Sequence, residues 1–134
     1  MIGSNTYWSW FMAIEKHILI VDDEEHARFG LGLLLSQAGF EVYDAADGLQ
    51  ALEQLRLRKM HMVLSDLHMP RMNGICFLKE VNRLYRGTGV IMMTSNASYG
   101  SCQEALRLGA YDYINKPLVF KELMALMHRY FLVH

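Results

Sequence analysis

The sequence predicts an α/β domain built on a doubly wound parallel sheet, and three observations support that fold class. Short apolar runs alternate along the chain with longer segments whose apolar residues recur at the helical period. The connections between these segments are short, which is typical of repeated strand–helix units. The chain has 134 residues, of which 52% are hydrophobic, so one domain can bury a core of its own.

The first strand and helix are predicted between residues 17 and 39. The run HILIV (17–21) is short, rich in β-branched residues and stopped by acids, as expected of a buried strand. Segment 24–39 is predicted to be helical, with Gly39 at the position of a C-terminal cap. Its apolar residues recur every three or four positions, at Ala27, Leu31, Leu34 and Ala38.

The next two strands and helices follow the same pattern. The run FEVYDA (40–45) alternates as a strand does, and the run MVLSD (62–66) predicts the third strand. Helices are predicted over 48–59 and 73–86, the second beginning with Asn73, a residue suited to an N-cap. The helix at 48–59 is expected to place three leucines on one side, Leu49, Leu52 and Leu55.

The last third of the chain repeats the unit twice. Strands are predicted over 89–95 and 111–115, the second stopped by a lysine and a proline. Helices are predicted over 101–109, which ends in glycine, and over 119–131. Right-handed crossovers would place the carboxyl ends of all five strands at one edge of the sheet, where ligands bind in such folds.

Polar residues stand at the expected ends of these strands, namely Asp22, Asp23, Glu24, Asp66, Thr94, Ser95 and Lys116. Neighbouring carboxylates raise one another's pKa, and a hard divalent cation such as Mg²⁺ relieves that repulsion. Lys116 and the Thr94 hydroxyl are suited to contact phosphoryl oxygens. Asp66 is then expected to act as a nucleophile that forms an aspartyl phosphate.

The loop after Asp66 agrees with this interpretation. Pro70 and Gly74 bracket a turn that would bring the backbone near the metal. Proline restricts the residue before it to extended geometry, which helps to fix that approach. We therefore expect the backbone carbonyl of His68 to be a further metal ligand.

Four motifs, in this order and spacing, resemble the receiver domain of two-component response regulators: ILIVDDEE, VLSDLHMPRMNG, IMMTS and GAYDYINKP. The resemblance covers residues 17 to about 131 and assigns 16–134 to one receiver domain. It implies a flavodoxin-like (βα)5 fold. It also implies that Asp66 receives its phosphoryl group from a histidine kinase or a phosphotransfer protein.

The same resemblance implies roles for the remaining residues. Mg²⁺, with Mn²⁺ as an alternative, would be held by Asp22, Asp23, Asp66 and the carbonyl of His68. Thr94 and Lys116 would sense the phosphoryl group, and Tyr113 would be the aromatic switch that follows Thr94. His68 and Asn96 would tune the rate of dephosphorylation. The surface of roughly 98–131, formed by the fourth helix, fifth strand and fifth helix, would be remodelled and is a candidate homodimer interface.

The expected function is therefore a cytoplasmic phosphoacceptor switch that regulates an output domain or a partner protein. It would catalyse only its own phosphorylation and dephosphorylation, and would not be an enzyme for an outside substrate. The alternative is a phosphate-independent interaction module of the same fold, which the complete set of acids argues against. A phosphatase that forms an aspartyl phosphate would have Asp-x-Asp-x-Thr or Asp-x-Asp-x-Val after the first strand, where this chain has DDEEH. A flavin carrier would have a phosphate-binding loop rich in hydroxyls and amides there, whereas this chain has acids.

The net charge and the cysteines limit the classes of partner that we expect for this chain. The net charge of −1 and the pI of about 6.6 do not favour nucleic acid or an anionic membrane as partner. Cys76 and Cys102 stand far apart without a CxxC spacing, so we expect reduced thiols. No DNA-binding motif follows Phe131, and we expect no direct nucleic-acid binding.

Residues 1–15 are interpreted as an aromatic leader that contains Trp8 and Trp10 and is disordered or derived from the expression vector. The alternative is an aromatic patch that docks on another chain or on the flank of the domain.

Overall fold

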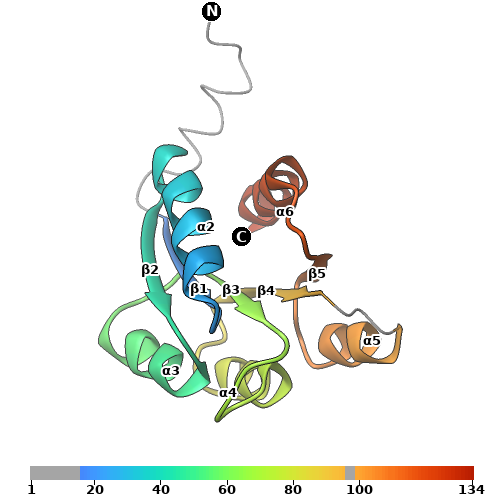
Figure 1. Ribbon diagram of the computed structural model, residues 1–134. Helices are drawn as coiled ribbons and strands as arrows, with labels where there is room; N and C mark the ends of the chain where they lie inside the picture. Colours follow the sequence, from blue (N-terminus) through green and yellow to red (C-terminus); the bar gives the residue numbers. More distant parts are fainter. Residues whose placement is uncertain (1–15, 96–98) are drawn as a thin grey trace, which may run out of the picture.

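The computed structural model describes residues 16–95 and 99–134 and shows the predicted α/β fold, with one five-stranded parallel sheet (Figure 1). The predicted leader (1–15) and Asn96 lie outside the described residues. The sheet has the order β2-β1-β3-β4-β5, and every neighbouring pair of strands is parallel. The strands are β1 (His17–Val21), β2 (Glu41–Ala45), β3 (Met62–Asp66), β4 (Gly89–Thr94) and β5 (Asp112–Asn115).

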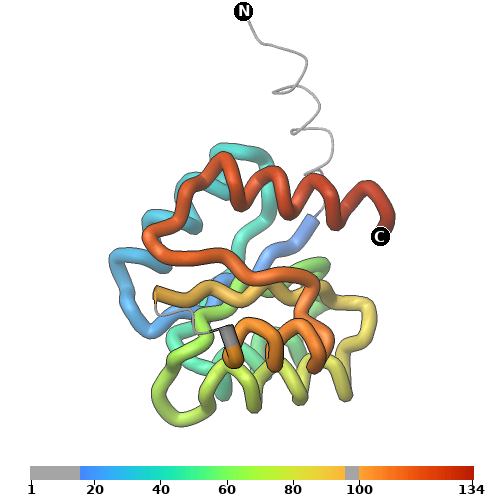
Figure 2. The backbone as a smooth tube through the Cα atoms, turned by 90° about the vertical axis from the view of Figure 1, so that its right-hand side faces the viewer, coloured from blue at the N-terminus to red at the C-terminus, as the bar shows by residue number. Residues whose placement is uncertain are grey.

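Five helices cover the sheet in two layers, as the views in Figures 1 and 2 show. One face carries α2 (Glu25–Gln37) and α6 (Phe120–Val133). The other face carries α3 (Gly48–Leu57), α4 (Gly74–Leu84) and α5 (Tyr99–Arg107). The sheet is thus covered on both faces, which is the usual environment of a parallel sheet.

The two faces of the sheet belong to two separate cores because side chains alternate along each strand. In β1, Leu19 and Val21 join the core under α3, α4 and α5, whereas Ile18 and Ile20 join the core under α2 and α6. All five residues of β3 and all six of β4 are buried. Each fully buried aliphatic side chain contributes about 1.5–3 kcal/mol to folding, so the central strands form the most stable part of the frame.

The buried face of α2 includes only part of the apolar pattern seen in the sequence. Leu31 is buried as expected, but its partner on the sheet side is Leu35, while Leu34 is 44% exposed and Ala27 is exposed as well. The run LGLLL offers leucines on several sides of a helix, so periodicity alone cannot choose among them. The helix itself was predicted correctly, and the packing of α2 on the sheet decides which of its apolar residues are buried.

The three leucines of α3 are buried to different extents. Leu55 is buried and Leu52 is half-buried, but Leu49 is 48% exposed. The buried positions near the start of this helix are Gly48 and Ala51. Small residues there allow the helix to lie close to its neighbours.

Side chains and glycines mark the helix ends largely as predicted. Asn73 caps α4, because its Oδ1 accepts a hydrogen bond of 2.9 Å from the N–H of Cys76. Gly39 and Gly109 follow α2 and α5 with φ of 101° and 106°, the left-handed conformation that glycine adopts without strain. Among the described residues, no helix is both long and apolar enough to cross a membrane.

Candidate functional site

Three carboxylates meet at the edge of the sheet where the strands end. Asp22 follows β1 directly, Asp23 comes next, and Asp66 is the last residue of β3. One carboxylate oxygen of each lies within 4.8 Å of the others. Asp22 and Asp66 are buried and Asp23 is exposed, so the cluster is open to solvent on one side. The structure thus brings together the acids that the sequence placed at two different strand ends.

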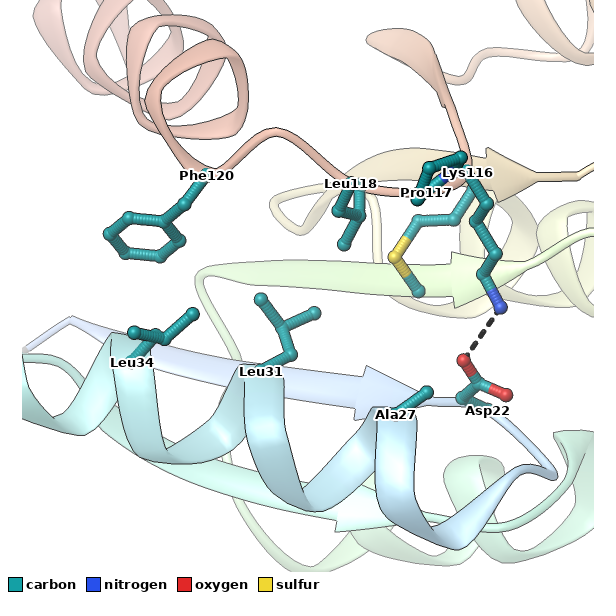
Figure 3. Close-up of a pocket in the computed structure, with 9 residues that line it drawn as sticks. Asp22, Ala27, Leu31, Leu34, Lys116, Pro117, Leu118 and Phe120 are labelled. Atoms are coloured by element: carbon teal, nitrogen blue, oxygen red, sulfur yellow. Dashed lines mark hydrogen bonds and ion pairs between the residues drawn. The ribbon is translucent and has the colours of Figure 1, made fainter.

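Lys116, which follows the outer strand β5, offsets part of the negative charge of this cluster. Its Nζ lies 2.7 Å from Oδ2 of Asp22, as Figure 3 shows, and 3.1 Å from Oδ2 of Asp66. Burial alone would lower the pKa of Lys116, but the hydrogen bonds and charges of the two aspartates outweigh it and raise that pKa above its ordinary value. The lysine therefore carries a positive charge at neutral pH and holds two acids that would otherwise repel each other.

Backbone and arginine contacts fix the position of Asp22. Its Oδ1 accepts a hydrogen bond of 2.9 Å from the N–H of Glu24. The guanidinium of Arg28 donates to the backbone carbonyl of Asp22 at 2.7 Å and to Asp44 at 2.9 Å. Helix α2 thereby anchors the end of β1, and the carboxylate of Asp22 points along the edge of the sheet toward Lys116.

The loop after β3 holds Asp66 in the same way. Oδ1 of Asp66 accepts a hydrogen bond of 3.2 Å from the N–H of His68, whose side chain is exposed. The N–H of Gly74 donates to the carbonyl of Leu67 at 2.9 Å. A Cβ at Gly74 would lie only 2.7 Å from the carbonyl oxygen of Asp66, so the chain needs glycine here for close approach of two backbone segments.

The other predicted residues occupy the neighbouring strands. Thr94 is buried at the end of β4, and its carbonyl accepts a hydrogen bond of 2.8 Å from the N–H of Lys116. Tyr113 is half-buried in β5, pairs in register with Met92 and packs against the core under α5. Thr94 and Lys116 thus lie side by side at the edge, whereas Asn96 lies outside the described residues.

Sequence reasoning missed one pair of residues near the site. The guanidinium of Arg71, in the loop after β3, forms an ion pair with the buried carboxylate of Asp47 at the start of α3. Asp47 also caps α3, since its Oδ1 accepts from the N–H of Gln50 at 2.9 Å. An acid directly before a predicted helix is a known capping signal and could have identified Asp47, but its pairing with Arg71 is a tertiary contact that no local pattern contains.

The donor set fits a hard divalent cation. Carboxylate oxygens are the ligands that Mg²⁺ and Mn²⁺ prefer, and Mg²⁺ typically uses one or two carboxylates and keeps several waters. Asp23 offers an exposed carboxylate beside two buried ones, so such an ion would retain access to solvent. An open coordination position is what a phosphoryl oxygen would need.

A groove of about 280 Å³ adjoins the cluster (Figure 3). Asp22 and Lys116 close one end, and apolar side chains from α2, from the segment before α6 and from the first residue of α6 form its walls, namely Ala27, Leu31, Leu34, Leu118 and Phe120. The exposed residues Ala27 and Leu34 of α2 therefore belong to this groove.

Known proteins are similar to this chain in sequence and in fold. The profile of the response regulator receiver domain matches residues 18–128. Transcriptional regulatory protein ZraR of Escherichia coli O157:H7 is 42% identical over 112 residues, which are 84% of this chain and 25% of ZraR. Regulatory protein AtoC of Escherichia coli strain K12 is 40% identical over 118 residues, 88% of this chain and 26% of AtoC. The chain thus spans about a quarter of the length of these relatives.

Solved structures show the same architecture. A CheY-like receiver domain protein from Methanospirillum hungatei JF-1 superposes with a TM-score of 0.83 at 30% identity, covering 87% of this chain and 93% of that one. CheY in the CheX–CheY–BeF3–Mg²⁺ complex from Borrelia burgdorferi gives a TM-score of 0.83 at 28% identity, covering 88% and 90%.

Proposed function

Since this chain belongs to the family of response regulator receiver domains, we propose that it is a phosphoacceptor switch in which Asp66 is the phosphorylated residue. The observation that carries the proposal is the cluster of Asp22, Asp23 and Asp66 with Lys116 placed against it. A related receiver of 28% identity was solved in a complex that contains BeF3 and Mg²⁺, which supports the same chemistry here.

The proposed donor is the phosphohistidine of a histidine kinase or of a phosphotransfer protein. A carboxylate oxygen of Asp66 attacks the phosphorus, the P–N bond to the donor imidazole breaks, and its electron pair stays on the imidazole nitrogen. The product is an aspartyl phosphate, and no outside substrate is turned over. Catalysis here consists of positioning and of charge stabilisation by groups that are already in place.

Each residue of the cluster has a proposed part in that transfer. Mg²⁺, or Mn²⁺, would be held by Asp22, Asp23, Asp66 and the carbonyl of His68. The bound ion would neutralise part of the negative charge of the phosphoryl group. The ammonium of Lys116, which contacts Asp66, would also contact a second phosphoryl oxygen. The N–H of His68 keeps one oxygen of Asp66 in a fixed orientation.

The proposed response starts at Thr94, which lies beside Lys116 at the end of β4. Its hydroxyl binds the phosphoryl group, Tyr113 follows it inward, and the surface of α5, β5 and α6 changes for an output domain, a partner protein or a second copy of the chain. A ligand shifts such an equilibrium only through different affinities for the two states, and the phosphoryl group supplies that difference. His68 and Asn96 would set how fast water removes it, and the proposed compartment is the cytoplasm.

The first test measures intact mass after incubation with acetyl phosphate and Mg²⁺. The wild-type chain is expected to gain the mass of one phosphoryl group, and the gain should disappear in Asp66→Asn and in the presence of a chelator. Asp112→Asn is the matched control, since it makes the same substitution at the opposite end of β5 from Lys116 and should leave the gain unchanged. A wild-type chain that gains no mass while a control receiver does would favour the phosphate-independent interaction module.

A further inference from the structure

The ion pair between Arg71 and Asp47 joins two loops at the edge of the sheet that carries the acids. Nε of Arg71 donates to Oδ2 of Asp47 at 2.9 Å, and Nη2 contacts the same oxygen. The two residues are 24 positions apart in the sequence. The side chain of Asp47 is 7% exposed and that of Arg71 is 56% exposed, so a surface arginine reaches a buried carboxylate. This pair is a tertiary tether between the loop after β3 and the start of α3.

Arg71 occupies an unfavourable backbone conformation. Its φ is 67°, in the left-handed region, where a residue with a Cβ is strained and glycine is not. Strained residues persist when the surrounding structure holds them in place, and they often lie at functional sites. At Arg71 the ion pair between its guanidinium and Asp47 holds the residue in this conformation.

A second contact ties the same part of the loop to the same helix end. A Cβ at Gly48 would lie only 3.0–3.1 Å from the side chain of Met72, so Met72 packs tightly on the first residue of α3. The N–H of Met72 also donates to the carbonyl of Pro70 at 2.7 Å, which makes the middle of the loop compact. Arg71 and Met72 together dock this turn on the start of α3.

The docked turn lies within the loop that begins at Asp66. Two residues after Asp66, the N–H of His68 holds Oδ1 of that carboxylate, and at the far end Gly74 returns to Leu67 through a backbone hydrogen bond. Neither Arg71 nor Asp47 has a hydrogen bond or ion pair with Asp22 or Asp66 in the described part of the chain. Any influence of the pair on the acids must therefore pass through the backbone of the loop.

We propose that the Arg71–Asp47 pair is a positioning latch, which fixes the backbone of the loop at His68 against Asp66 and so sets the affinity of the acidic cluster for a divalent cation. The inference rests on the proposed function, because it concerns the same cluster. The Mg²⁺ affinity of the chain is then set partly by two residues that do not themselves bind the ion.

Asp47 is ionised at neutral pH, so the latch is closed under ordinary conditions. Burial raises the pKa of Asp47, but the hydrogen bond from the N–H of Gln50 and the charge of Arg71 outweigh it and hold the pKa below its ordinary value. The two oxygens of this carboxylate have separate tasks, since Oδ1 caps α3 and Oδ2 binds Arg71. The cap and the latch can therefore be separated by mutation.

Two substitutions open the latch without removing other support. Asp47→Asn keeps a side-chain oxygen for the cap, because asparagine caps helices as well as aspartate does, but it presents no carboxylate to Arg71. Arg71→Gly removes the guanidinium and at the same time relieves the left-handed strain. Glu80→Gln is the matched control, since it breaks an exposed arginine–carboxylate pair within α4, between Glu80 and Arg83.

The test is calorimetric titration of the full chain with Mg²⁺, together with melting temperatures in chelator. We expect Asp47→Asn and Arg71→Gly each to weaken Mg²⁺ binding by about three- to tenfold while the melting temperature without Mg²⁺ stays close to that of the wild type. The double variant should be no weaker than either single one, because both remove the same interaction. Glu80→Gln should bind Mg²⁺ as the wild type does.

A second readout does not depend on the metal. In chelator, hydrogen exchange at the backbone amide of His68 should be faster in both variants than in the wild type, and equal to the wild type in Glu80→Gln. Unchanged Mg²⁺ affinity and unchanged exchange at His68 would overturn the latch, even if Asp66 is phosphorylated normally. The latch would also be overturned if the losses of Mg²⁺ affinity from the two single substitutions added up in the double variant. A wild-type chain that neither binds Mg²⁺ nor accepts phosphate would instead overturn the proposed function, and the exchange experiment would still decide the latch.

Discussion

Lys116 contacts two of the carboxylate groups that would hold a divalent cation. In this structure the ammonium contacts Oδ2 of Asp22 and Oδ2 of Asp66, two of the three acids that make up the cluster. Two cations that share these ligands repel each other, so either one weakens the binding of the other. The lysine therefore stabilises the metal-free chain and at the same time opposes the metal.

Lys116→Met should separate these two effects. Without the ammonium, the acids repel one another, and we expect the metal-free chain to lose about 1–3 kcal/mol of folding stability. Mg²⁺ should bind about three- to tenfold more tightly, a gain of roughly 0.7–1.4 kcal/mol. The increase in melting temperature on addition of Mg²⁺ should therefore exceed that of the wild type. Lys121→Met, at an exposed lysine in the first turn of α6, is the control, and an equal increase in all three proteins would contradict the competition.

One substitution, glycine to alanine, should have opposite effects at two positions. At Gly74 the new Cβ would lie 2.7 Å from backbone atoms of Asp66 and Leu67, so the loop must move, and we expect a loss of about 2–4 kcal/mol in stability. At Gly30, inside α2, the added Cβ meets nothing within 4 Å, and we expect a gain of about 0.5–1 kcal/mol from helix propensity. Urea unfolding of both variants measures these differences. A Gly74→Ala variant as stable as the wild type would show that the close approach is not needed.

At the scale of elements, the strands were easier to predict than the faces of the helices. The strand at Met62–Asp66 was predicted with both boundaries correct, because the run is too short for a typical helix and ends in an acid before a loop with proline and glycine. Leu34 and Leu49 recur at helical spacing with buried leucines and yet are about half exposed, since a helix with leucines all round can turn several faces to a sheet. The spacing of apolar residues identifies a helix, and packing against the sheet determines which of its faces is buried.

A side chain of α4 fastens the end of α5. The Nδ2 of Asn82 donates a hydrogen bond to the carbonyl of Leu108, just past the last residue of α5. Carbonyls at the end of a helix have no partner within the helix, so this contact satisfies one of them and ties two neighbouring helices together. It also joins α4, which follows the loop of Asp66, to the surface that we propose to change on phosphorylation.

Asn82→Ala should therefore loosen α5 more than the rest of the fold. We expect a loss of about 1 kcal/mol in global stability, the usual effect of removing one hydrogen bond. Amide exchange in the last turn of α5 should increase by a larger factor than exchange in α2. Lys79→Ala, at an exposed position of α4, is the control. Equal protection of α5 in the two variants would show that Asn82 does not hold this helix.

At the scale of the whole molecule, the parallel sheet explains why the site was predictable. The carboxyl ends of parallel strands meet at one edge, so Asp22, Asp66 and Lys116 could be brought together from strand order alone. The structure places them as expected, with Lys116 bound to both acids. The pair of Arg71 and Asp47 could not be found in this way, because it joins two loops whose paths depend on a left-handed residue and on packing at Gly48.

The contacts of Lys116 have a further consequence for how the molecule is made. Its two acidic partners lie 94 and 50 positions earlier in the sequence. A ribosome adds residues from the amino end at about 5–20 per second, so both acids are synthesised several seconds before the lysine that neutralises them. A chain interrupted within β5 would carry the acidic cluster without its internal cation, and would lack one edge of the sheet as well. The charges at this edge of the sheet are therefore balanced only once synthesis has passed β5, since the last strand of the sheet delivers the charge that the first and third require.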